Sequence, residues 1–284
     1  MGHKLNIPVF FTVLLTLLLS SCYKDLDLTG FIRSTDRANE RFTQSEQWNS
    51  QHPFREITID SDEYSLLVAA DSHIGGTVNF DKFVGEASKP DISAFVMVGD
   101  MVTGRKEDYN LFRQHLPPFD TVPYFLIAGN HELYFDGWKT FYDYFGSSTY
   151  LFTVKTNQAT DLFICLDTGG GTLGNKQLIW LEDILQHSRA GYRNCTVFTH
   201  NNFFRSRKTI TTNPLVEELY VLLDLFADHH VNLVINGHDH SRAEEVFGWT
   251  TYLILDALLD NDPNASYLKL TVDHGDIGYE FIGI

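Results

Sequence analysis

The sequence predicts a layered α/β fold built around a mixed β-sheet. Short apolar runs typical of buried strands alternate with segments of helical periodicity, and pairs of strands joined by tight turns follow. The 284 residues suffice for one large α/β domain, and the 43% hydrophobic content suffices to bury a core. No internal repeat is visible.

The net charge of the chain is −16. This charge argues against a surface that coats nucleic acid and against a face that binds anionic lipids. A small anionic substrate remains compatible with it, provided that the binding site itself is locally positive.

Residues 1–21 are the predicted targeting segment. Lys4 precedes the apolar run Pro8–Leu19, which is too short to span a bilayer comfortably. Leu19-Ser20-Ser21-Cys22 then resembles a bacterial lipoprotein signal, in which Cys22 would carry the lipid and begin the mature chain. An ordinary secretory signal beside a chance cysteine is the alternative.

Tyr23 follows this cysteine, in place of the aspartate that is associated with inner-membrane retention, which favours the outer membrane. The periplasmic and cell-surface faces both stay open. Residues 22–60 are interpreted as a tether and lead-in segment, and residues 61–284 as the folded domain. The polar stretch Asp36–Trp48 is either a short helix docked on that domain or a partly mobile spacer.

The first half of the domain contains three predicted buried strands, each ending at residues that could bind a metal. They are Leu66–Ala70 before Asp71-Ser72-His73, Phe95–Val98 before Gly99-Asp100, and Tyr124–Ala128 before Gly129-Asn130-His131-Glu132. The segments Asp81–Ser88 and Lys106–Leu116 between them are predicted helices, ended by prolines.

The second half adds helices, hairpins and two more strands of this kind. The two strands are Thr196–Thr199 before His200, and Val231–Ile235 before Gly237-His238-Asp239-His240. The expected helices are Lys139–Phe145, one capped by Asn175, and one opened by Asn213 and Pro214. The expected antiparallel pairs are the hairpin of Tyr150–Lys155 with Leu162–Leu166, and strands over Tyr252–Ile284 with a turn near Gly275.

Two cysteines beyond Cys22 lie in these apolar runs. Cys165 and Cys195 are interpreted as small buried hydrophobic residues, and a disulfide between them stays open in an oxidising compartment. The glycine-rich loop after Asp167 lacks the lysine and hydroxyl spacing of a phosphate-binding P-loop.

All five polar clusters lie at the carboxyl ends of predicted strands. Ligands of α/β folds gather at these ends, so one common site is the simplest inference. Imidazole and carboxylate groups are ordinary ligands of zinc, iron and manganese.

In chain order the clusters are Asp-x-His, Gly-Asp, Gly-Asn-His-Glu, a lone His and Gly-His-x-His. This ordered set, over about residues 64–245, resembles the calcineurin-like metallophosphoesterase family. Each cluster alone is a weak signal, whereas the ordered set is specific. The resemblance implies a four-layer α/β/β/α sandwich with mixed β-sheets.

The resemblance also implies seven metal ligands in two groups that share one bridging carboxylate. They are Asp71, His73 and His240 for one metal, Asn130, His200 and His238 for the other, and Asp100 between the two. His131 would not be a ligand, but would stabilise the phosphoryl oxygens or protonate the leaving oxygen. The rate should then show an acidic-to-neutral limb that depends on protonation of His131.

Two divalent ions, of manganese, iron or zinc, would activate water for attack. In two-metal sites the ions lie roughly 3.5–4 Å apart and lower the pKa of bound water to about 7, which gives hydroxide at neutral pH. Asp71 and Asp100 would offset only part of their charge, so the pocket would stay positive and suit a small phosphoester. Phosphodiester and phosphomonoester substrates remain equally compatible with the sequence.

The sequence departs from the family pattern at a few positions. Thr103 stands where purple acid phosphatases carry a metal-bound tyrosine, so a ferric–tyrosinate centre is not expected. Asn201 and Asn202 follow His200 where many members have histidine or proline, which puts the substrate contacts in doubt. Glu132 is expected to orient its neighbours or to cap the turn rather than to bind a metal.

Three arginines follow loops of the predicted site: Arg105, Arg205 and Arg207. They could grip a substrate phosphate, although solvated loop charges are the simpler interpretation.

The sequence therefore predicts metal-dependent hydrolysis of a phosphoric ester by an exported, lipid-anchored protein. The alternative is a non-catalytic cell-surface binding protein with a structural or vestigial metal site. The complete ligand set together with His131 argues against that alternative.

Overall fold

A computed structural model of the protein describes residues 36–52, 55–204 and 212–284. The predicted signal, Cys22 and Tyr23 lie outside these residues, as do Arg205 and Arg207. Within the described part of the chain, no helix is both long enough and apolar enough to cross a membrane.

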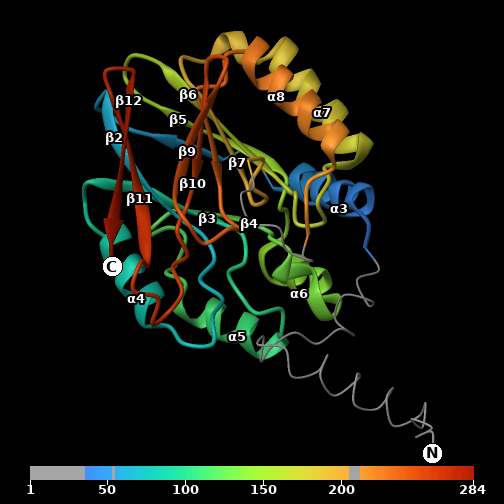
Figure 1. The fold of residues 1–284 in the computed structure, drawn as a ribbon. Helices are drawn as coiled ribbons and strands as arrows, with labels where there is room; N and C mark the ends of the chain where they lie inside the picture. The colour runs from blue at the N-terminus through green and yellow to red at the C-terminus, as the bar shows by residue number, and fades with distance from the viewer. Residues whose placement is uncertain (1–35, 53–54, 205–211) are drawn as a thin grey trace, which may run out of the picture.

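Two mixed β-sheets form the centre of the molecule (Figure 1). The seven-stranded sheet has the spatial order β1 (Arg55–Thr58), β5 (Tyr150–Lys155), β6 (Thr160–Leu166), β7 (Cys195–Thr199), β8 (Leu233–Asn236), β10 (Thr250–Ile254) and β9 (Ala243–Phe247). The five-stranded sheet has the order β12 (Asp276–Gly283), β11 (Ser266–Asp273), β2 (Glu63–Ala69), β3 (Ile92–Val98) and β4 (Tyr124–Ile127).

Each interface between layers is filled by its own hydrophobic core. In β2, Leu66 and Val68 pack between the two sheets, whereas Leu67 and Ala69 pack against helices. A strand covered on both faces needs apolar residues at every position, which explains the continuous apolar runs in the sequence.

Helices cover the outer face of each sheet. The five-stranded sheet is covered by α4 (Val78–Ala87), α5 (Lys106–His115) and α6 (Trp138–Phe145). The seven-stranded sheet is covered by α7 (Gly174–His187) and α8 (Val216–Asp228), which lie side by side in Figure 1. The predicted four-layer α/β/β/α sandwich is confirmed.

The helix α3 (Ala38–Gln51) packs against α7, so the docked-helix interpretation of residues 36–48 is the one that the structure shows. Further along, β1 pairs in parallel with β5. Part of the segment interpreted as a tether therefore contributes a helix and an edge strand to the domain.

Some boundaries differ from the prediction for local reasons. Leu173, rather than Asn175, precedes α7, and its backbone N–H donates to the Glu218 carboxylate. The helix α8 begins at Val216, two residues after Pro214, at which the sequence predicted its start.

The C-terminal strands also differ in part from the prediction. Strand β10 pairs in parallel with β8 and antiparallel with β9, whose exposed residues gave no strand signal. The β11–β12 hairpin is antiparallel, as predicted. Cys165 and Cys195 are both free and buried, so the disulfide left open by the sequence does not form.

Candidate metal centre

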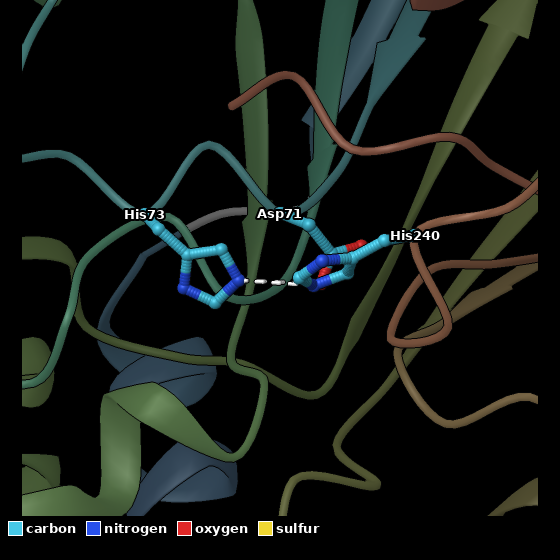
Figure 2. Close-up of side chains that lie close together, drawn as sticks. All are labelled: Asp71, His73 and His240. Carbon is cyan, nitrogen blue, oxygen red and sulfur yellow. Dashed lines mark hydrogen bonds and ion pairs between the residues drawn. The ribbon is translucent and has the colours of Figure 1, made fainter. Parts of the chain in front are cut away.

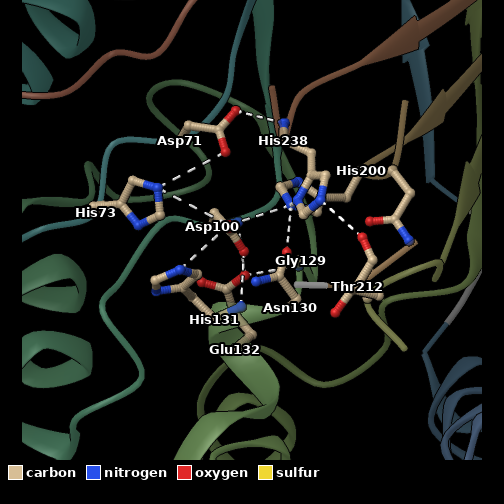
Figure 3. Close-up of polar contacts among 12 residues, drawn as sticks. Asp71, His73, Asp100, Gly129, Asn130, His131, Glu132, His200, Thr212 and His238 are labelled. Carbon is tan, nitrogen blue, oxygen red and sulfur yellow. Dashed lines mark hydrogen bonds and ion pairs between the residues drawn. The ribbon is translucent and has the colours of Figure 1, made fainter. Parts of the chain in front are cut away.

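The predicted site residues lie at the carboxyl ends of parallel strands from both sheets. The five-stranded sheet contributes Asp71 and His73 after β2, Asp100 after β3, and Asn130 and His131 after β4. The seven-stranded sheet contributes His200 after β7, and His238 and His240 after β8. The structure thus brings all of these side chains together along the seam between the sheets (Figures 2 and 3).

The backbone is unusual at five of the predicted ligands, because each has a positive φ although none is glycine. The values are 55° at Asp71, 39° at His73, 49° at Asp100, 76° at His238 and 54° at His240. This conformation is costly for residues with a Cβ and persists where the surroundings enforce it. Five of the ten non-glycine residues with positive φ in the described chain are predicted ligands, as expected where a site constrains the backbone.

Glycines let the site loops approach one another closely. A Cβ on Gly237 would lie 2.6 Å from Asp71 Oδ2, and one on Gly99 would lie 2.7 Å from Cγ of His200. A Cβ on Gly129 would lie 2.5 Å from the backbone nitrogen of Asp100. Each glycine precedes a predicted ligand, and a side chain there would displace a ligand supplied by another strand.

The first group of donors consists of Asp71, His73 and His240 (Figure 2). The Nε2 atoms of the two imidazoles lie 3.1 Å apart, and Nε2 of His240 lies 3.3 Å from Asp71 Oδ1. That oxygen is buried and accepts no hydrogen bond, whereas Asp71 Oδ2 accepts one from the backbone N–H of His238 at 2.8 Å. An unsatisfied carboxylate oxygen beside two imidazole nitrogens suits a divalent cation.

The second group surrounds His200 (Figure 3). Its Nε2 lies 3.3 Å from Asp100 Oδ2, 3.2 Å from Asn130 Oδ1 and 3.2 Å from His238 Nδ1. Asp100 Oδ2 also lies 3.9 Å from Nε2 of His73 in the first group. Asp100 therefore stands between the two groups, where the resemblance placed a bridging carboxylate.

Hydrogen bonds to carbonyl oxygens fix which ring nitrogen of two histidines faces the site. A carbonyl oxygen can only accept, so Nδ1 of His200 donates to Val98 O at 2.9 Å and leaves Nε2 to bind. By the same reasoning, Nε2 of His238 donates to Thr212 O at 3.0 Å and leaves Nδ1 to bind.

Burial and neighbouring charges perturb the titration of the site. Burial together with the nearby His131 lowers the pKa of His73 to about 3, which leaves its ring neutral. Burial would also lower the pKa of His200, but the carboxylates of Asp100 and Asp71 outweigh it and raise the value to about 10, so a cation would have to replace the proton on Nε2. Burial opposes ionisation of Asp71 and Asp100, yet the surrounding imidazoles lower the pKa of both.

Glu132 holds two of the site loops in register. Its carboxylate accepts backbone N–H bonds from Asp100 at 2.8 Å, Gly129 at 2.7 Å and Val102 at 3.1 Å. Burial, with the Asp100 charge, raises the pKa of Glu132 to about 8. These contacts show the orienting role expected from the sequence.

His131 is fixed beside the bridging position. Its backbone N–H donates to Asp100 Oδ1 at 2.8 Å, and its Nε2 lies 3.8 Å from Asp100 Oδ2. Its ring stands 4.4 Å from that of His73 and is partly exposed. His73, Asp100 and His131 also form a third group that geometry alone would allow to hold a cation.

The structure also places the neighbouring residues whose roles the sequence left open. Asn201 and Asn202 are buried and bond to Thr168 and Asp239 respectively, so they support the loops. The Thr103 hydroxyl donates to Asp108, and the exposed Arg105 precedes α5.

Two further residues contact predicted ligands: Tyr134, for which the sequence favoured packing and left a place in the cleft open, and Thr212, which the sequence did not single out. The Tyr134 hydroxyl accepts from Asn130 Nδ2 at 2.7 Å, and Thr212 orients His238 through its backbone carbonyl. The spacing of Tyr134, four residues after Asn130 in the Gly-Asn-His-Glu segment, is the only sequence signal for either.

The donors fit two divalent cations, because two groups of nitrogen and oxygen atoms converge on either side of one buried carboxylate. A four-layer sandwich with such a centre at the seam of its sheets fits the class of dinuclear metal-dependent hydrolases.

Comparison with known families agrees with this class. Residues 64–242 match the family model described as calcineurin-like phosphoesterase. The chain belongs to this family, whose members generally depend on a dinuclear metal centre, and it is a metallophosphoesterase. No curated protein matches the chain.

Solved structures with the same fold share little sequence with the chain. A dimetal phosphatase from Danio rerio is 13% identical with a TM-score of 0.59, over 78% of this chain and 96% of that one. GAP50, described as the anchor in the inner membrane complex of Plasmodium, is 13% identical with a TM-score of 0.58, over 78% and 85%. The purple acid phosphatase PPD1 from yellow lupin seeds is 15% identical with a TM-score of 0.59, over 78% and 52%.

Proposed function

We propose that the protein is an exported, lipid-anchored hydrolase of a small phosphoric ester. The main observation in support of the proposed hydrolysis is the position of Asp100, whose carboxylate lies between the two donor groups. The family assignment supports a small phosphoester substrate in general.

In this proposal Asp71, His73 and His240 would hold one cation, and Asn130, His200 and His238 would hold the other. Asp100, which stands between the two groups, would contribute to both. When bound in such a site, two divalent cations activate a water molecule and neutralise charge on the phosphoryl oxygens. The hydrogen bonds from His200 to Val98 and from His238 to Thr212 keep the binding nitrogens aimed inward.

We assign His131 the role of proton donor to the leaving oxygen, or of hydrogen-bond donor to the phosphoryl group. Its Nε2 faces the bridging carboxylate at 3.8 Å, and its ring is partly exposed to an incoming substrate. The two donor groups around Asp100 are complete without it, which supports a role other than metal binding.

The test is hydrolysis of bis(4-nitrophenyl) phosphate and 4-nitrophenyl phosphate by the protein supplied with Mn²⁺. Asp100→Asn should abolish both activities, whereas the exposed Asp183→Asn should not. His131→Asn should lower kcat at least about 100-fold and remove the acidic-to-neutral limb of the pH–rate profile. His187→Asn, at the exposed end of α7, is the matched control.

The same measurements address the non-catalytic alternative. GAP50 is described as an anchor, so the shared fold alone does not imply turnover. A wild-type protein that binds Mn²⁺ but hydrolyses neither ester would support a binding protein and overturn the proposed activity. A rate and pH profile unchanged in His131→Asn would remove only the assignment of that residue.

The proposed export and outer-membrane anchor are supported by the Leu19-Ser20-Ser21-Cys22 sequence and by Tyr23 after it. Metabolic labelling with a fatty-acid analogue should mark the wild-type protein and not Cys22→Ser. Equal labelling of the two would contradict the anchor.

A further inference from the structure

A cavity of about 360 Å³ opens beside the metal centre. Its lining includes Arg37 and Arg41 at the beginning of α3, Asn130 and Tyr134 after β4, Gly169 after β6, and Thr212. Its volume is at the lower end of the range for small-molecule sites, about 300–1,000 Å³. A cavity of about 490 Å³ elsewhere contains none of the predicted ligands.

Tyr134 connects the smaller cavity to the reacting groups. Its ring lies 4.5 Å from that of His131, and its hydroxyl accepts a hydrogen bond from the predicted ligand Asn130. A leaving group that receives a proton from His131 would therefore extend along Tyr134 into this cavity.

The part of the lining that α3 contributes is held by a buried ion pair. Arg41 Nε donates to Asp167 Oδ2 at 2.7 Å, and a second guanidinium nitrogen donates to the Asp36 carbonyl at 2.9 Å. Asp167 in turn accepts from the backbone N–H of Gly169 at 3.1 Å. The charge of Arg41 is therefore neutralised by Asp167, and its role is to fix α3 against the loop after β6.

Arg37 is the cation of this cavity that remains available. It is exposed at the start of α3, where its backbone N–H donates to Glu40. Over residues 36–52, 55–204 and 212–284, its guanidinium takes part in no ion pair. The neighbouring carboxylate of Asp36 is hydrogen-bonded by the Gln44 side chain.

We propose that the leaving group of the substrate occupies this cavity and carries a second anionic group that pairs with Arg37. A guanidinium binds carboxylate or phosphate oxygens in a bidentate manner, and the cavity is large enough for a sugar-sized alcohol. The substrate class is thus a phosphomonoester of a small polyol or sugar that bears a remote carboxylate or phosphate. This inference rests on the proposed hydrolysis.

The test compares 6-phosphogluconate with sorbitol 6-phosphate, which differ in having a carboxylate or a hydroxymethyl group at the remote end. Each compound is measured as a substrate and as a competitive inhibitor of 4-nitrophenyl phosphate hydrolysis with Mn²⁺ present. The wild-type protein should prefer 6-phosphogluconate in kcat/KM or in Ki. Arg37→Ala should lower that preference about ten-fold, as expected for loss of a charged hydrogen-bonded pair, and Arg37→Lys should lower it less.

Lys176→Ala is the matched control, because Lys176 is an exposed cation that contacts α3 at Thr43 from outside the cavity. It should leave the preference within about two-fold. A wild-type protein without the preference, or an Arg37→Ala protein that keeps it, would overturn the inference while leaving the hydrolytic function intact. Absence of 4-nitrophenyl phosphate hydrolysis in the wild-type protein would instead count against the proposed function. Titration calorimetry of 6-phosphogluconate and sorbitol 6-phosphate, with the wild-type and Arg37→Ala proteins, would then decide whether Arg37 discriminates between the two compounds.

Discussion

At the scale of single residues, glycines at the strand ends decide whether the predicted metal ligands can lie close together. Gly237 precedes His238, and a Cβ at this position would lie 2.6 Å from Asp71 Oδ2 and 2.7 Å from Ala70 Cβ. Both atoms belong to the segment that directly follows β2 of the other sheet, so neither can move without shifting the loop that carries Asp71. The glycine keeps the two sheets close enough to share a metal centre.

We therefore expect Gly237→Ala to lower Mn²⁺ affinity and Mn²⁺-dependent hydrolysis by at least about ten-fold, since displaced or poorly supported ligands weaken metal sites by factors of 10–100. Calorimetric titration of Mn²⁺ and a rate assay would measure both effects. Gly75→Ala lies in the loop after His73 and has no atom within 4 Å of the added Cβ, so it should stay within about two-fold of the wild type. Equal effects of the two substitutions would refute the steric argument.

At the scale of elements, a buried ion pair is among the contacts that attach α3 to the domain. The side chains of Arg41 and Asp167 are each only 3% exposed, and the guanidinium also stacks 5.7 Å from the Trp138 ring. The outer contact between Lys176 and Thr43 is exposed by comparison. The two contacts attach the same helix but differ in their access to water.

Arg41→Ala should lower the free energy of unfolding by about 3–5 kcal/mol, because it leaves the Asp167 charge buried without a partner. Lys176→Ala should lower it by no more than about 1 kcal/mol, since solvent screens exposed contacts. Urea unfolding followed by circular dichroism would measure both values. A cost below about 1 kcal/mol for Arg41→Ala would mean that the ion pair contributes little to the attachment of α3.

The elements that the sequence revealed are those with a strong local pattern. The strands that end at Asp71, Asp100 and His200 are buried on both faces, so each is recognisable in the sequence as a run of consecutive apolar residues. Strand β9 is exposed at all five positions and depends on pairing with β10, which no local pattern encodes. The docking of α3 likewise depends on a contact between Arg41 and Asp167, which are 126 positions apart.

The same distinction applies to the candidate site. The ligand side chains follow strand ends in short motifs, so the set of metal ligands could be predicted from the sequence alone. The cavity beside them could not be predicted, because Arg37, Tyr134 and Thr212 become neighbours only when α3 is docked and the two sheets are stacked. The metal-binding part of the site is thus encoded locally, whereas its substrate-facing wall depends on the tertiary fold.

At the scale of the whole molecule, a polar network joins the two sheets away from the metal centre. Arg193 donates to Asp161 in β6 at 2.6 Å and to Asp62 beside β2 at 2.7 Å. The Tyr64 hydroxyl in β2 also donates to Asp161, at 2.9 Å. The network therefore holds the sheets together, as the seam that carries the metal ligands requires.

This network should make stability depend on pH through Asp62. Hydrogen bonds from Thr156 and Arg193 hold the pKa of Asp62 below its ordinary value. A carboxylate whose pKa is lower in the folded state stabilises the fold fully above its unfolded pKa, about 3.9, and loses that contribution as the pH falls through its folded pKa. Asp62→Asn should therefore be less stable than the wild type at pH 7 and pH 5, and the difference should shrink between pH 4 and pH 3.

Urea unfolding of both proteins across this range would measure the difference. The exposed Asp183→Asn is the control, and it should stay within about 0.5 kcal/mol of the wild type throughout. A difference that stays constant or grows toward acid would show that the Asp62 carboxylate does not stabilise the fold through Arg193. The attachment of the sheets would then rest on the apolar core between them and on Asp161, which keeps its bonds to Arg193 and Tyr64 in the Asp62→Asn protein.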